Sequence, residues 1–247
     1  MSVFVCAVVV AAVPTYAQEW MKILQGTVEA VTDQPSRDSG AASMMGLSTH
    51  DLVSGLKEAL VVGTKTVTGQ LGAADGFNTD PAVHIPLPKE LQTVQSTLRK
   101  FGLGGLADDV ELKLNRGAEA AMPKAKQLVL DAITSMTLQD AKAIYEGPND
   151  AATQYFRRVS SQDLKSTMAP VIDKTLQDVG AVTAYDQLVG EYKSIPFVPD
   201  LKANLTDHAT DLALEGLFHY LAAEEAAIRQ NPAKRTSEIL MKVFGAK

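Results

Sequence analysis

The chain has 247 residues and a formal net charge of −6, with 46% hydrophobic and 21% charged residues. This balance is typical of a soluble globular protein, and the length suffices for one large domain or two small ones. The acidic charge is spread along the chain, which argues against a nucleic-acid binder and against simple adsorption to anionic lipid, because both need a basic face.

Residues 1–17 have the features of a signal peptide. Residues 3–13 are almost wholly apolar, a run too short to span a membrane but right for a signal-peptide core. Cleavage near Ala17 would leave a periplasmic or secreted protein without a transmembrane helix. No Lys or Arg precedes Lys22, so the charged start of a signal peptide is missing. Two alternatives therefore stay open: a true start upstream of this one, or a buried N-terminal strand or helix.

Cys6 is the only cysteine and falls inside the predicted signal peptide. The mature chain would then have no thiol, which excludes a structural disulfide, a thiolate nucleophile and a cysteine metal site. No lipobox of small residues precedes Cys6, so lipid anchoring at this residue is not expected.

Residues 18–47 are predicted to be an N-terminal segment without a core of its own. Its part from Thr32 to Gly46 is rich in Pro, Ser, Gly and Ala, which predicts a mobile linker. Helical periodicity starts at Ser48, which has capping-box spacing to Asp51, with Asp in place of the usual Glu. The apolar face that follows predicts a helix ending near Leu71 and Gly72.

Two further helices are expected before residue 137. Pro88 suits the first turn of one of them, and the glycine-rich residues 102–105 end it. The next begins at Asp108 and has a heptad-like seam of small and apolar residues, namely Leu114, Ala118, Ala121, Ala125, Leu128, Ala132 and Met136. Pro123 is expected to kink or split this helix.

The rest of the chain is also predicted to be helical. The capping residues are Thr137 with Asp140, Asn149 or Asp150, Ser160 or Ser161, Asp200, and Asn231 before Pro232. They open a short helix to Tyr145, a helix to Val159, a helix through Val179, a long helix from Leu201 to about Arg229, and a last helix through Phe244. Another helix holds Leu188 and Tyr192. No stretch shows sustained period-two alternation, so we expect an all-α, single-domain bundle of about eight to ten helices over residues 48–247.

Several blocks of the chain occur in one order and resemble a known family: "GLKEAL" (55–60), "DGF" with "IPLP" (75–88), "NRGAEAAMPKAK" (115–126), "AATQYFRR" (151–158) and "EGLFHYLAAEEAAIRQNPAKRTSEIL" (215–240). Together they resemble the bacterial domain of unknown function 4197, a family of exported proteins and lipoproteins of Gram-negative bacteria. The resemblance covers residues 47–245 and implies a cell-envelope location. It implies no activity, and the missing lipobox cysteine keeps lipoprotein status from being carried over.

The long C-terminal helix contains a carboxylate at an unexpected position. Glu224 falls on the apolar stripe formed by Leu214, Leu217, Leu221 and Ile228. A carboxylate on a core face must be paired, hydrogen-bonded or protonated. We therefore expect Glu224 to be buried against Arg116 or Arg157, either as a structural ion pair or as a general acid/base. The neighbouring Glu225 can reach Arg229 one helical turn later.

A second polar cluster consists of Asn115, Arg116 and Glu119. Arg116 and Glu119 lie one helical turn apart, and Asn115 lies one turn before the seam residue Ala118. These groups are predicted to specify packing inside the bundle or to line a cavity.

The stretch from Gly147 to Ser166 combines aromatic, basic and hydroxyl side chains. Ala151, Ala152, Tyr155 and Val159 are predicted to form its inner face. Arg157, and Tyr155 through its hydroxyl, are candidates to contact Glu224 or an anionic ligand.

Motifs for cofactors and metals are missing from the sequence. The four histidines lie apart, without an HxxxH or HExxH pair, so zinc is not expected. Residues 75–80 offer oxygen ligands but lack a twelve-residue calcium loop, and there is no P-loop, GxGxxG or GxSxG. We expect no cofactor and favour a non-enzymatic protein that binds a small or lipid-like ligand or an envelope protein. The alternative is a hydrolase or lyase that uses a buried Glu with Arg partners.

Overall fold

The computed structural model describes residues 48–100, 104–190, 201–235 and 237–245. The chain separates into two units, residues 1–40 and 41–247, and all described residues belong to the second. The predicted signal peptide, the predicted linker, Tyr192 and the cap Asp200 lie outside the described residues.

The described residues contain eight α-helices, one short 3₁₀ helix and no strand. This confirms the predicted all-α, single-domain bundle. The elements are α2 (Thr49–Leu71), α3 (Lys89–Lys100), α4 (Gly104–Ser135), α5 (Leu138–Glu146), α6 (Ala151–Asp178), α7 (Ala181–Gly190), α8 (Leu201–Gln230), η2 (Pro232–Lys234) and α9 (Glu238–Gly245).

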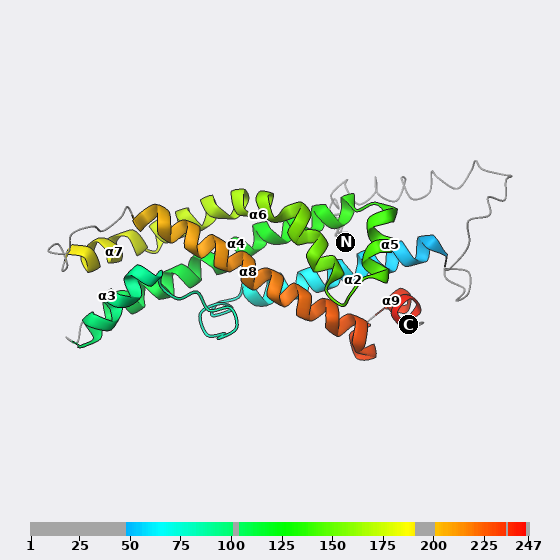
Figure 1. Cartoon of the computed structure of the whole chain (residues 1–247), viewed down its shortest axis with the longest axis horizontal. Coiled ribbons are helices and arrows are strands. Elements are labelled where there is room, and N and C mark those ends of the chain that lie inside the picture. Colours follow the sequence, from blue (N-terminus) through cyan, green and yellow to red (C-terminus); the bar gives the residue numbers. More distant parts are fainter. Residues whose placement is uncertain (1–47, 101–103, 191–200, 236, 246–247) are drawn as a thin grey trace, which may run out of the picture. The chain divides into compact units, whose positions relative to one another are not determined.

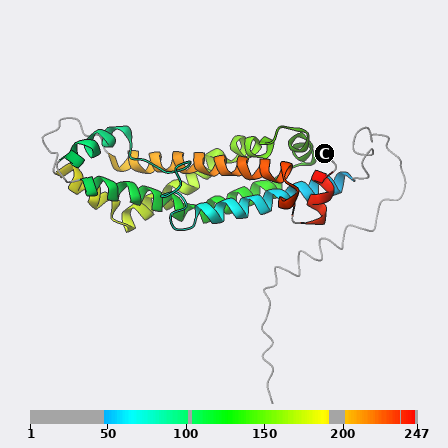
Figure 2. The ribbon, with the colours of Figure 1, turned by 90° about the horizontal axis from the view of Figure 1, so that it is seen from below.

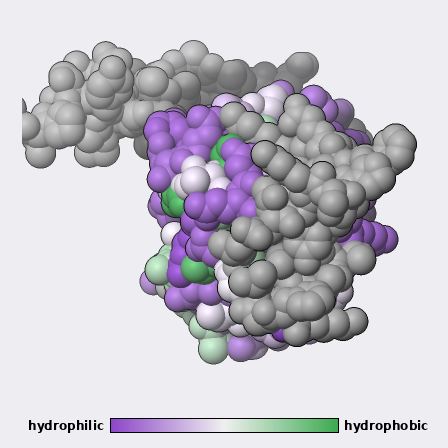
Figure 3. Space-filling model, turned by 90° about the vertical axis from the view of Figure 1, so that its left-hand side faces the viewer, coloured by the Kyte–Doolittle hydropathy of each residue, from purple (hydrophilic) through white to green (hydrophobic). Residues whose placement is uncertain are grey.

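The four long helices α2, α4, α6 and α8 pack lengthwise against one another (Figures 1 and 2). The short helices α3 and α7 pack on α4 at one end of this group, and α5 and α9 pack on α2 at the other. The end with α3 and α7 faces the viewer in Figure 3, where the visible described residues are mostly hydrophilic with a few scattered hydrophobic ones. None of the helices in the described part is both long and apolar enough to cross a bilayer.

Two of the predicted helix starts are confirmed at the level of single hydrogen bonds. At α2 the backbone N–H of Asp51 donates to Ser48 Oγ at 3.0 Å, and Ser48 N–H donates to the Asp51 carboxylate at 3.4 Å. At α5 Thr137 and Asp140 make the same reciprocal pair, at 3.2 and 3.0 Å. These bonds satisfy backbone donors that the first helical turn leaves without a partner.

The seam predicted on α4 is correct at its N-terminal end and drifts toward its C-terminal end. Leu114, Ala118, Ala121 and Ala125 are fully buried. The predicted positions Leu128 and Ala132 are only partly buried, and the inward positions belong to Val129 and Ile133 instead. Met136, the last predicted position of the seam, is buried as expected, so the deviation is confined to Leu128 and Ala132.

Several predicted helix boundaries are wrong, among them the start of α4, which lies at Gly104 and not at Asp108. The helix expected to end at Val159 continues to Asp178, and the Ser161 hydroxyl, expected as a cap, donates to the carbonyl of Arg157 within the helix. Pro123 was expected to kink or split its helix, and it does not split it, since α4 passes through this proline as one helix. The last helix starts later than expected, because Asn231 caps the 3₁₀ turn η2 and α9 begins only at Glu238.

Candidate functional site

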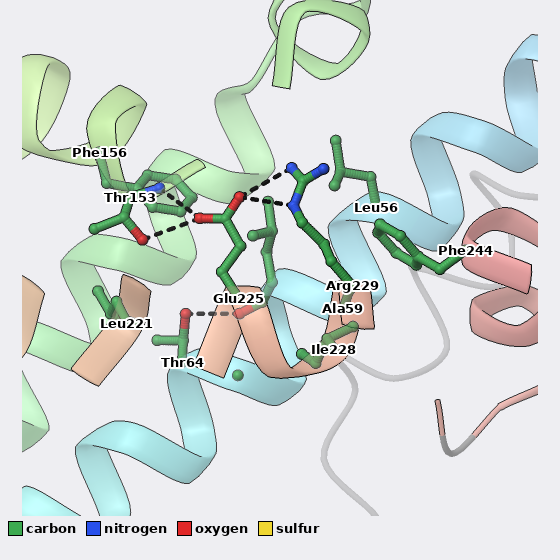
Figure 4. Close-up of a pocket in the computed structure, with 12 residues that line it drawn as sticks. Leu56, Ala59, Thr64, Thr153, Phe156, Leu221, Glu225, Ile228, Arg229 and Phe244 are labelled. Carbon is green, nitrogen blue, oxygen red and sulfur yellow. Dashed lines mark hydrogen bonds and ion pairs between the residues drawn. The ribbon is translucent and has the colours of Figure 1, made fainter. Parts of the chain in front are cut away.

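A buried ion pair on α8 holds the turn between α5 and α6 (Figure 4). Glu225 Oε1 accepts from the N–H of Ala152 at 3.0 Å, and Oε2 accepts from the N–H and hydroxyl of Thr153 at 3.0 Å each. Arg229 Nη2 donates to Glu225 Oε1 at 2.9 Å, and both side chains are 7% exposed. The predicted contact between Glu225 and Arg229 is therefore confirmed.

This pair caps two helices that come from elsewhere in the chain. Glu225 meets the N–H groups at the start of α6, whereas Asp150, at the N-cap position, makes no capping bond with its side chain. Arg229 donates to the carbonyls of Ile144 at 2.7 Å and Tyr145 at 3.4 Å, at the end of α5. Each charge thus lies at the helix end whose dipole it complements. The role of the pair is to fix the α5–α6 turn.

Glu224 does not pair with an arginine, and that prediction is wrong. Its carboxylate accepts from Lys234 Nζ at 3.1 and 3.0 Å. The side chain is 16% exposed, because its stem passes α2 at Gly63, where a Cβ would lie 3.5 Å from Glu224 Cγ. The inward position at this level of α8 is Glu225, and Glu224 lies on the flank to which η2 returns.

Three polar side chains on α4 hold the loop between α2 and α3, residues 72–88. They are Glu111, Asn115 and Glu119, spaced one per helical turn on one face of α4. Asn115 is fully buried, and its side chain accepts from the N–H of Ile85 and donates to the carbonyl of Ile85, both at 2.9 Å. The prediction that Asn115 faces the bundle is confirmed, and it pairs there with irregular backbone.

Glu119 and Glu111 bind the same loop on either side of Asn115. Glu119 Oε1 accepts from the N–H groups of Phe77 at 3.2 Å and Asn78 at 3.4 Å. Glu111 Oε2 accepts from the N–H of Leu87 at 3.3 Å. Sequence reasoning missed Glu111, although its four-residue spacing to Asn115 could have indicated it.

Arg116 completes the cluster at the start of the loop. Its guanidinium donates to Glu119 at 2.7 Å, as predicted, and to Asp75 at 2.8 Å. The hydrogen bond to Glu119 raises the pKa of Arg116 above its usual value. The pKa of Asp75 is lowered, first by a hydrogen bond from Asn78 and then by Arg116.

The loop also contacts α8, which fixes it as a third wall beside α6 and α8. His208 Nε2 lies 2.8 Å from the carbonyl of Pro86. The Tyr220 hydroxyl donates to the carboxylate of Asp80. A side chain at Gly216 would meet the loop, since its Cβ would lie 2.9 Å from the Phe77 ring. The loop is therefore attached along its length to two helices.

A groove of about 480 Å³ opens between these three walls. It is lined by Asp150, Thr153, Gln154 and Arg157 of α6, by Leu212, Glu215, Gly216, Phe218, His219 and Ala222 of α8, and by Ala82, Val83 and His84 of the loop. The lining is mostly polar and includes charges of both signs. It is much larger than the second cavity described below.

Arg157 is the cation at the centre of this groove. Its guanidinium carbon lies 4.6 Å from the centre of the Phe218 ring. Among the described residues the guanidinium makes no ion pair or hydrogen bond, and the side chain is exposed. The predicted contact between Arg157 and Glu224 is therefore wrong, and the groove leaves Arg157 open to an anion.

Tyr155 lies away from the groove, and the predicted inner face of its helix is correct only in part. Ala152 is buried as predicted, and Ala151 and Tyr155 are partly buried against the core. The other buried positions are Thr153, Phe156 and Ser160, whereas Val159 is 45% exposed. Burial raises the pKa of Tyr155, and the negative charge of Asp140 adds to this shift. The helix is turned by about one residue from the expected orientation, because it runs on as α6 and its face is set by the packing of the whole helix.

A second, smaller cavity lies beside the ion pair of Glu225 and Arg229 (Figure 4). Its walls are chiefly apolar side chains of α2, α6, α8 and α9, including Leu56, Phe156 and Phe244. It has room for about one water molecule, at about 20 Å³. Within the described residues no three His, Cys, Asp or Glu side chains form a group that could hold a metal ion.

The chain matches the profile of a known protein family. No match is found among curated proteins or among solved structures. The profile of the family described as "Protein of unknown function (DUF4197)" matches residues 46–245. The chain therefore belongs to the DUF4197 family.

Proposed function

We propose that the protein is an exported, non-enzymatic binding protein whose ligand occupies the groove between α6, α8 and the loop 72–88. The observation that carries this proposal is Arg157, a cation that lies over Phe218 in the groove without an anionic partner among the described residues. An arginine held flat on an aromatic ring keeps its donors in place for a carboxylate or phosphate.

The size and lining of the groove favour a small polar ligand over a lipid chain. Its volume of about 480 Å³ lies within the usual range of ligand sites, about 300–1,000 Å³. Three of its α6 side chains, Asp150, Gln154 and Arg157, are polar or charged. An acyl chain would leave these groups without partners and gain little apolar contact.

The alternative of a hydrolase or lyase that uses a buried Glu with Arg partners loses its geometric basis. Both carboxylate oxygens of Glu225 already accept hydrogen bonds from the protein, and the carboxylate of Glu224 forms an ion pair with Lys234. In the groove both ring nitrogens of His84 are engaged, with the carbonyl of Asn78 and with Glu111, each at 2.9 Å. A general base needs a free lone pair within reach of a substrate proton. In the described part of the chain, the groove residues Asp150, Glu215 and His219 are not engaged in this way, so the turnover assay below tests the enzyme class.

A matched pair of tryptophan variants tests the binding site. Ala222 lines the groove, and the next residue, Ala223, is exposed on α8 outside it. Native mass spectrometry of gently purified protein should detect a co-purifying small molecule in the wild type and in A223W but not in A222W. Identical spectra for the two variants would refute the groove as the site, and turnover of a substrate by the wild type would favour an enzyme.

The export part of the proposal rests on the apolar residues 3–13 and on the small residue Ala17. We expect a full-length fusion in a Gram-negative host to be recovered from the periplasm with Gln18 as its first residue by intact mass. Recovery of the uncleaved chain in the cytoplasm would contradict this part and leave the groove proposal standing.

A further inference from the structure

We infer that the ligand is dipolar: an acidic group binds Arg157, and an ammonium group of the same molecule binds Asp150. This inference rests on the proposed function, because it assigns the ligand class of the same groove. It uses two charges of opposite sign that line the groove from one helix.

Asp150 is available to a ligand because Glu225, and not Asp150, caps the start of α6. An aspartate at an N-cap position ordinarily accepts from the first N–H groups of its helix. Here Glu225 accepts from those groups, and Asp150 makes no capping bond with its side chain. Its carboxylate accepts from Gln154 Nε2 at 3.0 Å, and among the described residues it makes no ion pair.

The two charges lie on one face of α6. Asp150, Gln154 and Arg157 are spaced by four and three residues, which aligns them along the groove. The seven residues from Asp150 to Arg157 correspond to about 10 Å along the helix axis. Gln154 lies between them: its amide NH₂ can donate to the acidic end of a bound molecule, and its amide oxygen can accept from the ammonium end.

The register of α6 against α8 orders the groove from end to end. Glu225 meets Ala152, and Phe218 meets Arg157, so α8 runs antiparallel to α6. Glu215, the second carboxylate of the lining, therefore lies beyond Arg157 on the side away from Asp150. The order is Asp150, Arg157, Glu215, which gives the groove one central cation between two acidic ends.

Asp150 is the favoured partner of the ammonium group because it lies in the same row of α6 as Arg157, so one helix fixes the spacing of the two charges. Gln154 lies in the same helical row and donates to the Asp150 carboxylate. Glu215 lies on the opposite wall and is the competing candidate for the ammonium group. A ligand that reaches both Asp150 and Arg157 should gain binding free energy from charge-assisted hydrogen bonds at both residues, whereas a ligand with a single charge gains it at one residue only.

A set of three probes of one length tests the inference: 6-aminohexanoate, hexanoate and hexylamine. In 6-aminohexanoate the two charges lie about 8 Å apart when the chain is extended. Titration calorimetry or NMR at pH 7 and low salt should give 6-aminohexanoate an affinity about tenfold or more above that of either single-charge probe. Equal affinities for 6-aminohexanoate and hexanoate would overturn the dipolar assignment.

Four variants assign the two ends of the probe. R157Q should weaken hexanoate and 6-aminohexanoate by about tenfold or more, and D150N should weaken 6-aminohexanoate by a similar factor while leaving hexanoate unchanged. R158Q removes the same charge as R157Q outside the groove and should leave the affinity for all three probes within about threefold. E215Q tests the competing carboxylate at the other end of the groove. A loss in E215Q in place of D150N would overturn the assignment of Asp150.

The outcome also separates this inference from the proposed function. If A222W loses a co-purifying molecule while the three probes bind equally, the groove is a binding site and the dipolar class is wrong. If no probe binds and no molecule co-purifies with the wild type, both are wrong.

Discussion

The buried carboxylate of α8 should be far more sensitive to substitution than its neighbour. Glu225 is 8% exposed and receives donors on both oxygens: Ala152 N–H and Arg229 on Oε1, and the N–H and hydroxyl of Thr153 on Oε2. In E225Q one oxygen becomes an NH₂ group. Whichever way the amide is turned, this group faces donors, so one set of bonds is lost and Arg229 keeps a buried, uncompensated charge.

The expected cost follows from the burial of both partners. Breaking one side of a buried ion pair costs about 3–5 kcal/mol. For a chain of this size that corresponds to a fall in melting temperature of about 6–20 °C. E224Q is the matched control, because Lys234 is 44% exposed and such a pair contributes only about 0–1 kcal/mol.

Urea and thermal unfolding followed by circular dichroism at pH 7 measure both variants. E225Q should also release the α5–α6 turn, which amide hydrogen exchange at Ala152 and Thr153 would detect. If E225Q and E224Q lose the same free energy of unfolding within about 1 kcal/mol, the capping role of Glu225 is refuted.

Two further predictions concern the loop 72–88. G216A should destabilise the protein by about 1–3 kcal/mol in urea unfolding despite the better helix propensity of Ala, because its Cβ would lie 2.9 Å from the Phe77 ring. In G69A the added Cβ would have no neighbouring atom within 4 Å, so this variant should be neutral or more stable. Equal losses of unfolding free energy in G216A and G69A would contradict the close approach of Gly216 to Phe77. Y220F should destabilise most at neutral pH. The hydrogen bond from Tyr220 lowers the pKa of Asp80, and the same bond raises the pKa of Tyr220. Its stabilisation is therefore complete between the unfolded values of about 4 and 10 and is lost as the pH falls through the pKa of Asp80 or rises through that of Tyr220. A difference between wild type and Y220F that is the same at pH 3, 7 and 11 would contradict the bond.

Local patterns in the sequence predicted the helices well, because they depend on neighbours in the chain. Both capping boxes, at Ser48 and at Thr137, were read from residues three positions apart and are present in the structure. The start of α6 was predicted from Asp150 as the N-cap. The helix does begin there, but the Asp150 side chain makes no capping hydrogen bond. The capping group, Glu225, lies 73 positions later in the chain, so no local pattern could indicate it.

The candidate site was predicted in part for a similar reason. The helical spacing of the apolar residues placed Glu224 on the apolar stripe of α8. The apolar face of a helix is broad, so this spacing does not decide which of two adjacent carboxylates faces the core. Glu225 is the inward one, because the donors that satisfy it come from α6 and the charge that balances it from Arg229. Arg157 was predicted to contact Glu224 or an anionic ligand; the structure contradicts the first contact and places Arg157 in the groove, where the ring that it contacts, Phe218, was recognisable only in the fold.

The buried polar residues and the groove fit one physical explanation. Burying a carboxylate or an amide is costly unless every polar atom is bonded, and among the described residues no buried side-chain polar atom lacks a partner. Glu225 accepts hydrogen bonds from backbone N–H groups at the start of α6, and Asn115 and Glu119 accept them from backbone N–H groups of the loop 72–88. The start of α6 and the loop belong to two of the three groove walls. The polar residues that attract attention in the sequence therefore hold the groove in shape, whereas the residue left for a ligand is the exposed Arg157.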